Sequence, residues 1–234
     1  MIMNHRIIDI TKYDSKDKSE VFVTLNEDDY QNPVSTLKRI RNNPDSFVKN
    51  ETIIRVSQSQ YKKFLEYLDR TNEFFLKDFG SIANAKFLLA FSFGENPEVN
   101  SQIAQLIFDT VKPSSLCGLY MQWEIALEFE KRIKGYNSFS VIPIKLNPGQ
   151  KYMTTLDVAN KFKNLSQVSK NDSVFVVGQS WHGLSYIAVC KEINIKVIGG
   201  RFINAFATND EQDWVRNAFA WILKESTKNK NISL

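Results

Sequence analysis

The sequence predicts an α/β protein: a Rossmann-like, doubly wound, mainly parallel five-stranded sheet with an N-terminal helical arm. Two observations support this prediction. From Lys86 onward, apolar runs alternate with segments of helical period, which is the pattern of parallel strands joined by crossover helices. Several of these runs are apolar at successive positions, as in strands covered on both faces. The expected strand order across the sheet is 3-2-1-4-5.

The N-terminal part of the chain has a different pattern. It contains turn-rich pieces such as RNNPDS (41–46) and one strongly amphipathic segment. The apolar residues that share a face of this segment are Tyr61, Phe64, Leu65, Leu68 and Phe75. We therefore expect residues 1–80 to form a helical arm packed on the core, and residues 81–234 to form the Rossmann-like domain.

Each element of the predicted domain has its own apolar run or stripe. The strand candidates are Lys86–Phe93, Ser115–Tyr120, Phe139–Leu146, Ser173–Gln179 and Ile195–Gly200. The helical stripes between and after them cover 99–107, 125–133, 158–165 and 214–222. The last stripe follows TNDE (208–211), whose spacing is that of a capping box that opens a helix.

The composition is that of a folded chain able to bury a full core. Hydrophobic residues make up 43% and charged residues 24% of the 234 residues. The start has no apolar run of signal-peptide length, and no segment approaches the roughly 20 apolar residues that span a bilayer. We therefore expect a cytoplasmic protein without a membrane span.

The two cysteines and the net charge narrow the function classes further. Cys117 and Cys190 lie in apolar settings without metal-ligand spacing, which predicts reduced, buried thiols and neither a disulfide framework nor a zinc site, and we expect no structural metal. The net charge is +4, and all of this excess lies after residue 80. An anionic small-molecule ligand suits this distribution. The basic residues are scattered, which disfavours nucleic acid as a partner.

Polar residues follow four of the predicted strands, at the edge where ligands bind in open α/β sheets. These residues are Ser92, Gly94, Glu95 and Asn96 after the first strand, Gln122 and Glu124 after the second, Thr154, Thr155 and Asp157 after the third, and Gln179, Ser180 and His182 after the fourth. Helix N-termini at this edge present free N–H groups to anions. The sequence therefore predicts one site at this rim.

His182 is the strongest candidate for a general acid or base, because an imidazole gains and loses a proton near pH 7. The alternative is that His182 caps the helix or fills a polar niche. Ser180 lies in GQSWHG, which lacks the GxSxG nucleophile elbow, so we expect it to bind a ligand or cap the helix. Glu124 and Asp157 complete the expected catalytic set by orienting the ligand, although the helix dipole alone also favours Glu124 at its position.

The other rim residues have two readings each. Gly94 lets the backbone approach a phosphate, or forms a plain turn. Glu95, Glu124 and Asp157 could share an oxygen-ligated cation of the Mg²⁺ type or bind ligand hydroxyls. Trp123 and Trp181 stack on a ring or fill the core. The expected ligand contacts are Ser92, Gly94, Glu95, Gln122, Thr154, Thr155 and Ser180.

Several of these motifs resemble the SanA-like and YdcF-like proteins, the vancomycin high-temperature exclusion group. In TTLDVA, Thr155, Asp157 and Ala159 match the family pattern and Thr154 replaces its asparagine. GQSWHGLSYIA is similar to the family segment that carries a histidine after the fourth strand, and QWEIA carries the helix-opening glutamate. The C-terminal DWVRNAFAWILKE is similar to the last helix of that family. The resemblance covers about residues 86–225.

The sequence also departs from the family pattern. The serine lies two residues before His182 instead of three, the following arginine is missing, and the glycine-rich segment is reduced to Gly94. The resemblance implies a Rossmann-like fold, an envelope-related role and a nucleotide-like ligand, without a defined reaction. Two functions stay open: a ligand-binding protein or enzyme with its site at the rim, and a non-catalytic protein-interaction module with a vestigial site. The sequence names no cofactor.

Overall fold

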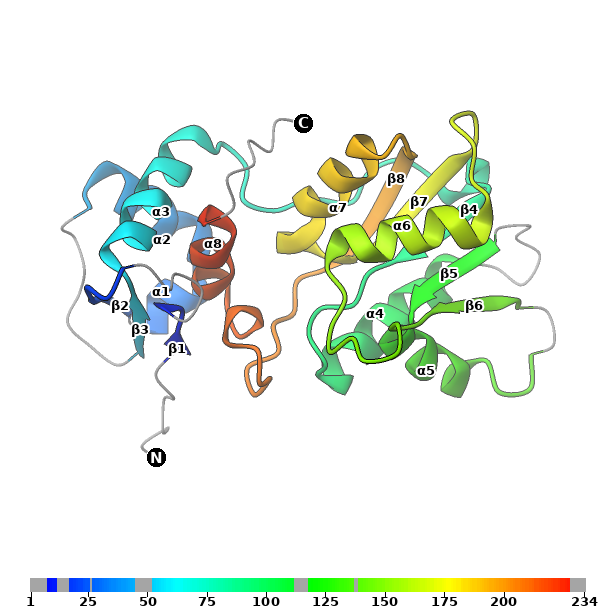
Figure 1. The fold of residues 1–234 in the computed structure, drawn as a ribbon, viewed down its shortest axis with the longest axis horizontal. Coiled ribbons are helices and arrows are strands. Elements are labelled where there is room, and N and C mark those ends of the chain that lie inside the picture. The colour runs from blue at the N-terminus through cyan, green and yellow to red at the C-terminus, as the bar shows by residue number, and fades with distance from the viewer. Residues whose placement is uncertain are drawn as a thin grey trace. The chain divides into compact units, whose positions relative to one another are not determined.

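The computed structural model describes residues 8–11, 17–25, 27–44, 52–111, 118–136 and 139–227. These residues form two units (Figure 1). One unit runs from Phe75 to Ala205, and the other joins the described residues up to Phe74 with those from Phe206 onward. Each unit has its own sheet.

The unit from Phe75 to Ala205 contains a five-stranded sheet in which every neighbouring pair is parallel. Its strands are β4 (Phe87–Ala90), β5 (Gly118–Gln122), β6 (Val141–Ile144), β7 (Ser173–Gln179) and β8 (Lys196–Ile203). Their order is β6-β5-β4-β7-β8, which confirms the predicted order 3-2-1-4-5 and the Rossmann-like, doubly wound fold class. The strand order reverses between β4 and β7, so the crevice expected in such sheets lies at their carboxyl ends.

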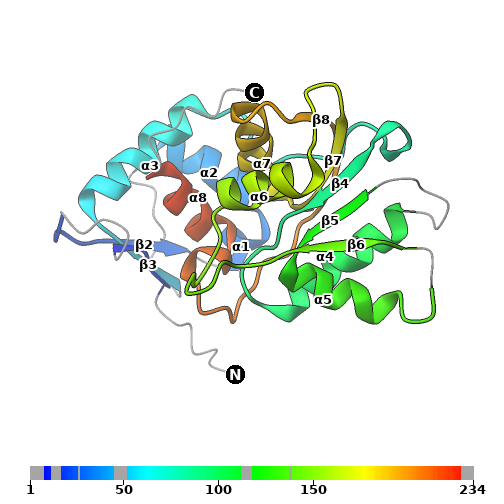
Figure 2. The ribbon, with the colours of Figure 1, turned by 45° about the vertical axis from the view of Figure 1, so that its right-hand side comes forward.

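Helices cover both faces of this sheet. They are α4 (Pro97–Thr110), α5 (Trp123–Arg132), α6 (Thr155–Ser166) and α7 (Ser180–Glu192), and a short 3-10 helix, η2 (Ile82–Asn84), precedes β4. Figure 2 shows α4 and α5 on one face and α6 and α7 on the other. All four residues of β4 are buried, which explains why its sequence is apolar at successive positions. Aromatic rings of Phe87, Tyr120 and Phe162 meet edge to face in the core.

The two edges of the sheet differ. The segment before η2 runs beside β8, where Phe79 and Gly200 exchange backbone hydrogen bonds of 3.1 and 2.9 Å. Gly80 has φ 63°, and a Cβ there would lie 2.1 Å from the carbonyl oxygen of Ile198, so this close approach requires glycine. The β6 edge carries Pro143, which offers no backbone donor to a further strand.

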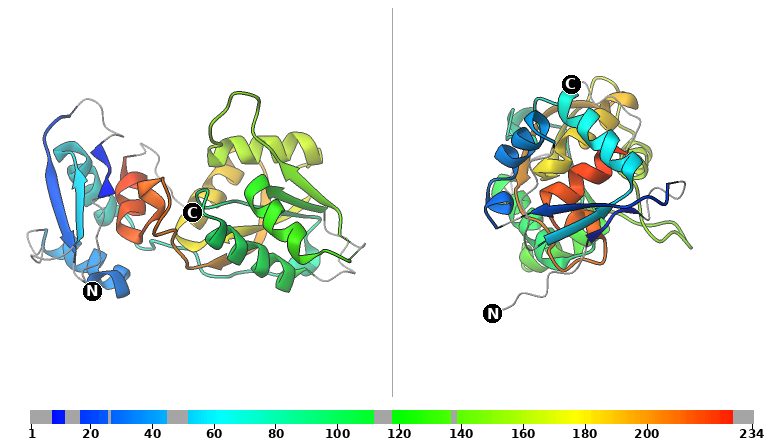
Figure 3. Two further views of the ribbon diagram at one scale, coloured as in Figure 1. Left: turned by 90° about the horizontal axis from the view of Figure 1, so that it is seen from below. Right: turned by 90° about the vertical axis from the view of Figure 1, so that its left-hand side faces the viewer.

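The other unit contains a three-stranded sheet with β1 (Ile8–Asp9), β2 (Val21–Leu25) and β3 (Thr52–Val56) in the order β1-β3-β2. Its helices are α1 (Glu27–Gln31), α2 (Pro33–Asn42), α3 (Gln58–Arg70), η3 (Asp213–Val215) and α8 (Ala218–Ser226). Figure 3 shows these elements from two further directions. A complete capping box between Ser57 and Gln60 starts α3.

This division differs from the predicted one at two points. The N-terminal segment contains three short strands besides its helices, and the chain from Phe206 onward, with α8, belongs to the same unit. Each residue from Ala218 to Leu223 is buried, and α8 packs against α3. Sequence patterns within one segment do not show such pairing between distant segments, because burial there depends on the partner helix.

Two helix boundaries also differ from the predictions. The stripe 214–222 is interrupted: η3 ends at Val215, and α8 starts after Asn217, whose side chain accepts a hydrogen bond from the N–H of Ala220 at 2.9 Å. TNDE therefore does not open the helix; Arg216 donates to the carbonyl of Asp210 at 2.7 Å and holds a turn there.

The second boundary is the end of α3 at Arg70. Phe75 lies beyond this helix, and its ring packs on that of Trp181 with the ring centroids 5.5 Å apart.

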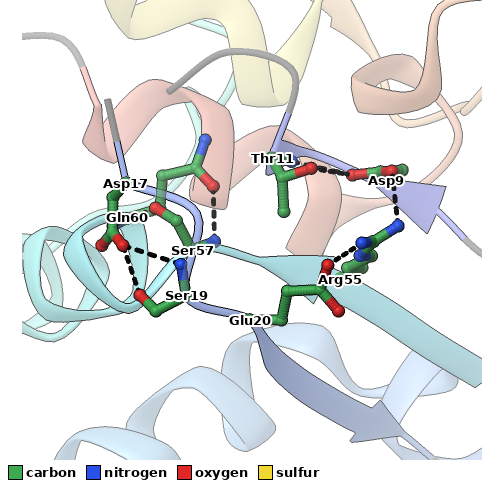
Figure 4. A network of polar contacts seen from close by, with 8 residues as sticks. All are labelled: Asp9, Thr11, Asp17, Ser19, Glu20, Arg55, Ser57 and Gln60. Atoms are coloured by element: carbon green, nitrogen blue, oxygen red, sulfur yellow. Dashed lines mark hydrogen bonds and ion pairs between the residues drawn. The ribbon is translucent and has the colours of Figure 1, made fainter. Parts of the chain in front are cut away.

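Figure 4 shows the polar network of the three-stranded sheet. Arg55 on β3 pairs with Asp9 on β1 at 3.4 Å and with Glu20 just before β2. The side chains are more than a third exposed, so we expect each pair to contribute no more than about 1 kcal/mol. This network connects neighbouring strands.

Two further sequence predictions concern cysteine and the membrane. Cys190 is a free, buried thiol, and burial raises its pKa to about 12, as expected for an inert core cysteine. Cys117 lies outside the described residues. Of the helices in the described ranges, none combines the length and apolar character needed to cross a membrane.

Candidate functional site

The loop after β4 is held by asparagines of the next helix. Asn100 accepts a hydrogen bond from the N–H of Phe93 at 3.3 Å and donates one to the carbonyl of Gly94 at 3.1 Å. Gly94 has φ 72°, a conformation that favours glycine. Asn96 caps α4 by accepting from the N–H groups of Glu98 and Val99. The glycine therefore has a structural role in this turn.

The junction between β5 and α5 is arranged differently. Gln122 occupies the N-cap position of α5 but makes no capping hydrogen bond with its side chain. Its Oε1 accepts instead from the N–H of Ser92 at 3.1 Å, which ties the β4 and β5 loops together. Both residues are buried. The N-terminus of α5 thus has no side-chain cap, and Glu124 lies in its first turn.

Glu124 has an unusual electrostatic environment. The pKa of its carboxyl is raised from 4.5 to about 7, chiefly by burial and to a smaller extent by the neighbouring charge of Glu95. Its own backbone and the polar groups of Gln122 and Ser92 lower the pKa and offset part of this effect. The Oε2 atom is buried and accepts no hydrogen bond from the residues that the structure describes. Near neutral pH, the protonated and the ionised forms of this carboxyl are therefore both populated.

The start of α6 uses two of the predicted site residues as a capping box. Thr154 Oγ1 accepts from the N–H of Asp157 at 3.1 Å, and Asp157 Oδ2 accepts from the N–H of Thr154 at 2.9 Å. These contacts account for both residues by local structure. Thr155, the next residue, has its Oγ1 2.9 Å from Nε2 of His182.

The junction between β7 and α7 is extensively hydrogen bonded. Gln179 Oε1 accepts from the N–H groups of Trp181 at 2.7 Å and His182 at 3.1 Å, and its Nε2 donates to the carbonyl of Ala205 at 3.3 Å. Asn204 Oδ1 accepts from Ser180 Oγ at 3.3 Å and from Trp181 Nε1 at 2.8 Å. Ser180 and Trp181 are buried. Both residues fill this junction.

His182 is half-buried, and aromatic rings surround it. Its ring centroid lies 4.4 Å from that of Tyr186, one turn further along α7, and 6.1 Å from that of Phe93 after β4. Tyr186 in turn stacks on Phe91 at 4.3 Å and 7°. These contacts and the Thr155 hydroxyl fix the imidazole beside the end of β4.

The rim residues thus fall into two groups. Thr155 and His182 meet across the β6 and β7 loops, while Ser92, Gln122 and Glu124 gather across the β4 and β5 loops. Phe93 borders the first group. Since β4 lies between β5 and β7, and strands are about 4.8 Å apart, Glu124 and His182 follow strands that are roughly 10 Å from each other.

Sequence reasoning missed two asparagines. Asn100 is 1% exposed on the buried face of α4, and a polar residue within that apolar stripe is the signal that would have identified it. Asn204 follows β8, which runs to Ile203 and not to Gly200 as predicted. With that boundary, the rule that polar residues after strands mark the rim would have included it.

A groove lies beside Trp123, next to Glu124. It has a volume of about 440 Å³. Its walls come from α5 and from the end of β6 and the residues after it: Trp123, Ala126, Leu127, Glu130, Pro143, Lys145 and Leu146. Nε1 of Trp123 is buried and has no hydrogen-bond partner among the described residues.

The geometry does not support the shared-cation alternative. Within the described ranges, no group of three or more His, Cys, Asp or Glu side chains is placed to hold a metal ion. Asp157 is engaged at the start of α6, while Glu124 and Glu95 lie at the β4 and β5 loops.

Comparison with protein-family models, with curated protein sequences and with solved structures finds no match to this chain. The resemblance to the SanA-like and YdcF-like proteins therefore stays a prediction.

Proposed function

We propose that this chain binds a small nucleotide-like ligand at the C-terminal rim of its five-stranded sheet, and that Glu124 and His182 transfer protons there. One observation carries the proposal: the half-buried carboxyl of Glu124, whose pKa burial raises to about 7, lies at the rim of a Rossmann-like sheet. Perturbed groups of this kind are concentrated at functional sites.

The two residues suit acid–base chemistry in different ways. A carboxyl with a pKa near 7 donates or accepts a proton at neutral pH. The His182 imidazole is held by the Thr155 hydroxyl, which accepts from or donates to Nε2 according to the tautomer. The two residues follow β5 and β7, which β4 separates, so the strands that carry them are about 10 Å apart.

The charges at the rim orient such a ligand. Glu95 and Glu124 favour hydroxyl or amine groups on the side of β4 and β5. Lys145 and Lys151, both exposed in the segment between β6 and α6, favour an anionic group. The SanA-like and YdcF-like resemblance supports the same class of ligand. A cytoplasmic location remains a prediction from the sequence.

The test compares two rim variants with a matched control. Glu124→Gln and His182→Asn remove the proton-transfer groups, whereas Glu98→Gln changes an exposed carboxylate in the first turn of α4. A thermal-shift screen of nucleotides, followed by titration calorimetry, measures affinity for each protein. We expect the rim variants to bind about tenfold more weakly and the control to match wild type. Equal responses of all four proteins would remove the site assignment.

A second function is favoured because the protein's own side chains occupy much of the rim. Asn96, Thr154 and Gln179 cap three of its four helices, and Ser180 and Trp181 occupy the β7 junction. This arrangement suits a protein-interaction module with a vestigial site. The same screen separates the two functions, because the module predicts no nucleotide response from wild type.

A further inference from the structure

The groove beside Trp123 extends the proposed site, and its walls are largely apolar. Trp123, Ala126 and Leu127 contribute the helix side, and Pro143 and Leu146 the strand side. Its volume of about 440 Å³ lies in the range of pockets that hold small molecules. Trp123 begins α5, and Lys145 and Leu146 follow β6, so one end of the groove lies at the carboxyl ends of the strands.

Charge and hydrogen-bonding groups define what could occupy the groove. Lys145 lies at its strand side and Glu130 at its helix side, and both side chains are exposed. The buried Trp123 Nε1 lacks an acceptor among the described residues, which is uncommon for an indole. This donor is shielded from the groove by its burial, so the polar recognition available to an occupant comes from the exposed Lys145, which suits an anionic group.

We propose that this groove binds the planar aromatic ring of an anionic ligand, with the ring against Trp123 and the negative group toward Lys145. The proposal rests on the proposed function, because it assigns the ring subsite of the same ligand. The Trp123 indole and the apolar walls favour a flat ring over a sugar.

Three probes separate the parts of such a ligand. Adenosine 5′-monophosphate carries ring and charge, adenosine carries the ring alone, and ribose 5-phosphate carries the charge alone. Titration calorimetry on wild type is expected to show that the monophosphate binds at least about tenfold more tightly than either fragment. No preference for the monophosphate over ribose 5-phosphate, or no binding of any probe, would overturn the ring subsite.

Two exposed leucines provide a blocking variant and its control. Leu127 in the groove is 50% exposed, and Leu165 on α6, outside the groove, is 53% exposed. We expect Leu127→Trp to fill the groove and to weaken monophosphate binding about tenfold, to the level of ribose 5-phosphate. Leu165→Trp should change no affinity by more than about twofold. Wild-type monophosphate affinity in a folded Leu127→Trp protein would refute the subsite.

A charge reversal tests the groove without adding bulk. Lys145→Glu is expected to weaken monophosphate binding about tenfold and to leave adenosine binding unchanged, while Lys151→Glu, outside the groove, has the smaller effect. Equal effects of the two reversals would refute the role of Lys145. If the groove variants weaken binding but Glu124→Gln and His182→Asn do not, the ring subsite stands and the proton-transfer function fails. If the rim variants weaken binding but the groove variants do not, the ring subsite is refuted and the rim assignment stands.

Discussion

The β5–α5 and β7–α7 junctions have similar sequences but different hydrogen-bonding arrangements. Each buried strand ends in a glutamine, Gln122 or Gln179, followed within two residues by a tryptophan. Gln179 caps its own helix, whereas Gln122 binds the N–H of Ser92 in the neighbouring loop. The same residue type at the same position thus stabilises one helix and leaves the other without a side-chain cap.

The tryptophans differ in the same way. Trp181 donates to Asn204 at 2.8 Å, while Nε1 of Trp123 has no acceptor in the described part of the chain. The polar groups of the β7 junction therefore bind one another, whereas the β5 junction keeps a buried indole N–H without an acceptor among the described residues. A polar residue after a strand therefore marks a rim position, and its hydrogen bonds distinguish a structural role from a functional one.

The largest expected effect tests how tightly the β7 junction is packed. In Gly178→Ala, the new Cβ would lie 2.5 Å from Cε2 of Tyr186, which is fully buried and stacked on Phe91. The ring cannot withdraw, so we expect a loss of about 3 kcal/mol in the free energy of unfolding, measured by denaturant titration.

The control is the same substitution in the strand that leads to the other junction. In Gly118→Ala, the nearest atom to the new Cβ would be Cδ1 of Phe87, at 3.2 Å. We expect a loss below about 1 kcal/mol. Equal losses from the two substitutions would show that the junctions do not differ in packing.

The next effect compares the glutamines themselves. Gln179→Ala removes the acceptor for two N–H groups and the donor to Ala205, so we expect a loss of about 2 kcal/mol in unfolding free energy. Gln122→Ala leaves one buried N–H, that of Ser92, without its acceptor, which costs about 1 kcal/mol. Denaturant titration of both variants measures the difference. A larger loss from Gln122→Ala would reverse the assigned roles.

Most of the sheet could be predicted because its signals are local. Strands buried on both faces are apolar without interruption, and the alternation with helical stripes predicts parallel order. The grouping of α8 with the three-stranded sheet could not be predicted, because it depends on contacts between segments distant in the sequence. The start of α8 was missed because Asn217, and not TNDE, supplies its cap.

The candidate site was predictable only as a list of rim positions. The rule for carboxyl ends of strands identified Glu124 and His182 together with Asp157 and Ser180. It could not show that Asp157 closes a capping box or that Ser180 binds Asn204, because those partners are set by the exact turn. The raised pKa of Glu124 depends on burial and on Glu95, and neither can be read from the letters QWE.

The smallest expected effect tests the electrostatics of the β5 junction through pH. Burial raises the pKa of Glu124 from 4.5 to about 7, so the native state keeps this proton over a range in which the unfolded state has lost it. The native state is therefore penalised progressively as the pH rises from about 4.5 to about 7, and by a constant amount above that. Glutamine stays neutral at every pH. The free energy of unfolding of Glu124→Gln should therefore equal that of wild type near pH ~4 and be about 1 kcal/mol larger near pH ~8.

The expected gain is modest because part of the Glu124 side chain still contacts water, which reduces the cost of its charge. Glu98→Gln is the control, since its carboxylate lies at the same place in α4 but is exposed. Denaturant titrations of wild type and both variants across this pH range measure the difference. A Glu124→Gln protein whose stability follows wild type at every pH would place this carboxyl in contact with solvent. The contrast between the two junctions would then rest on hydrogen bonds alone.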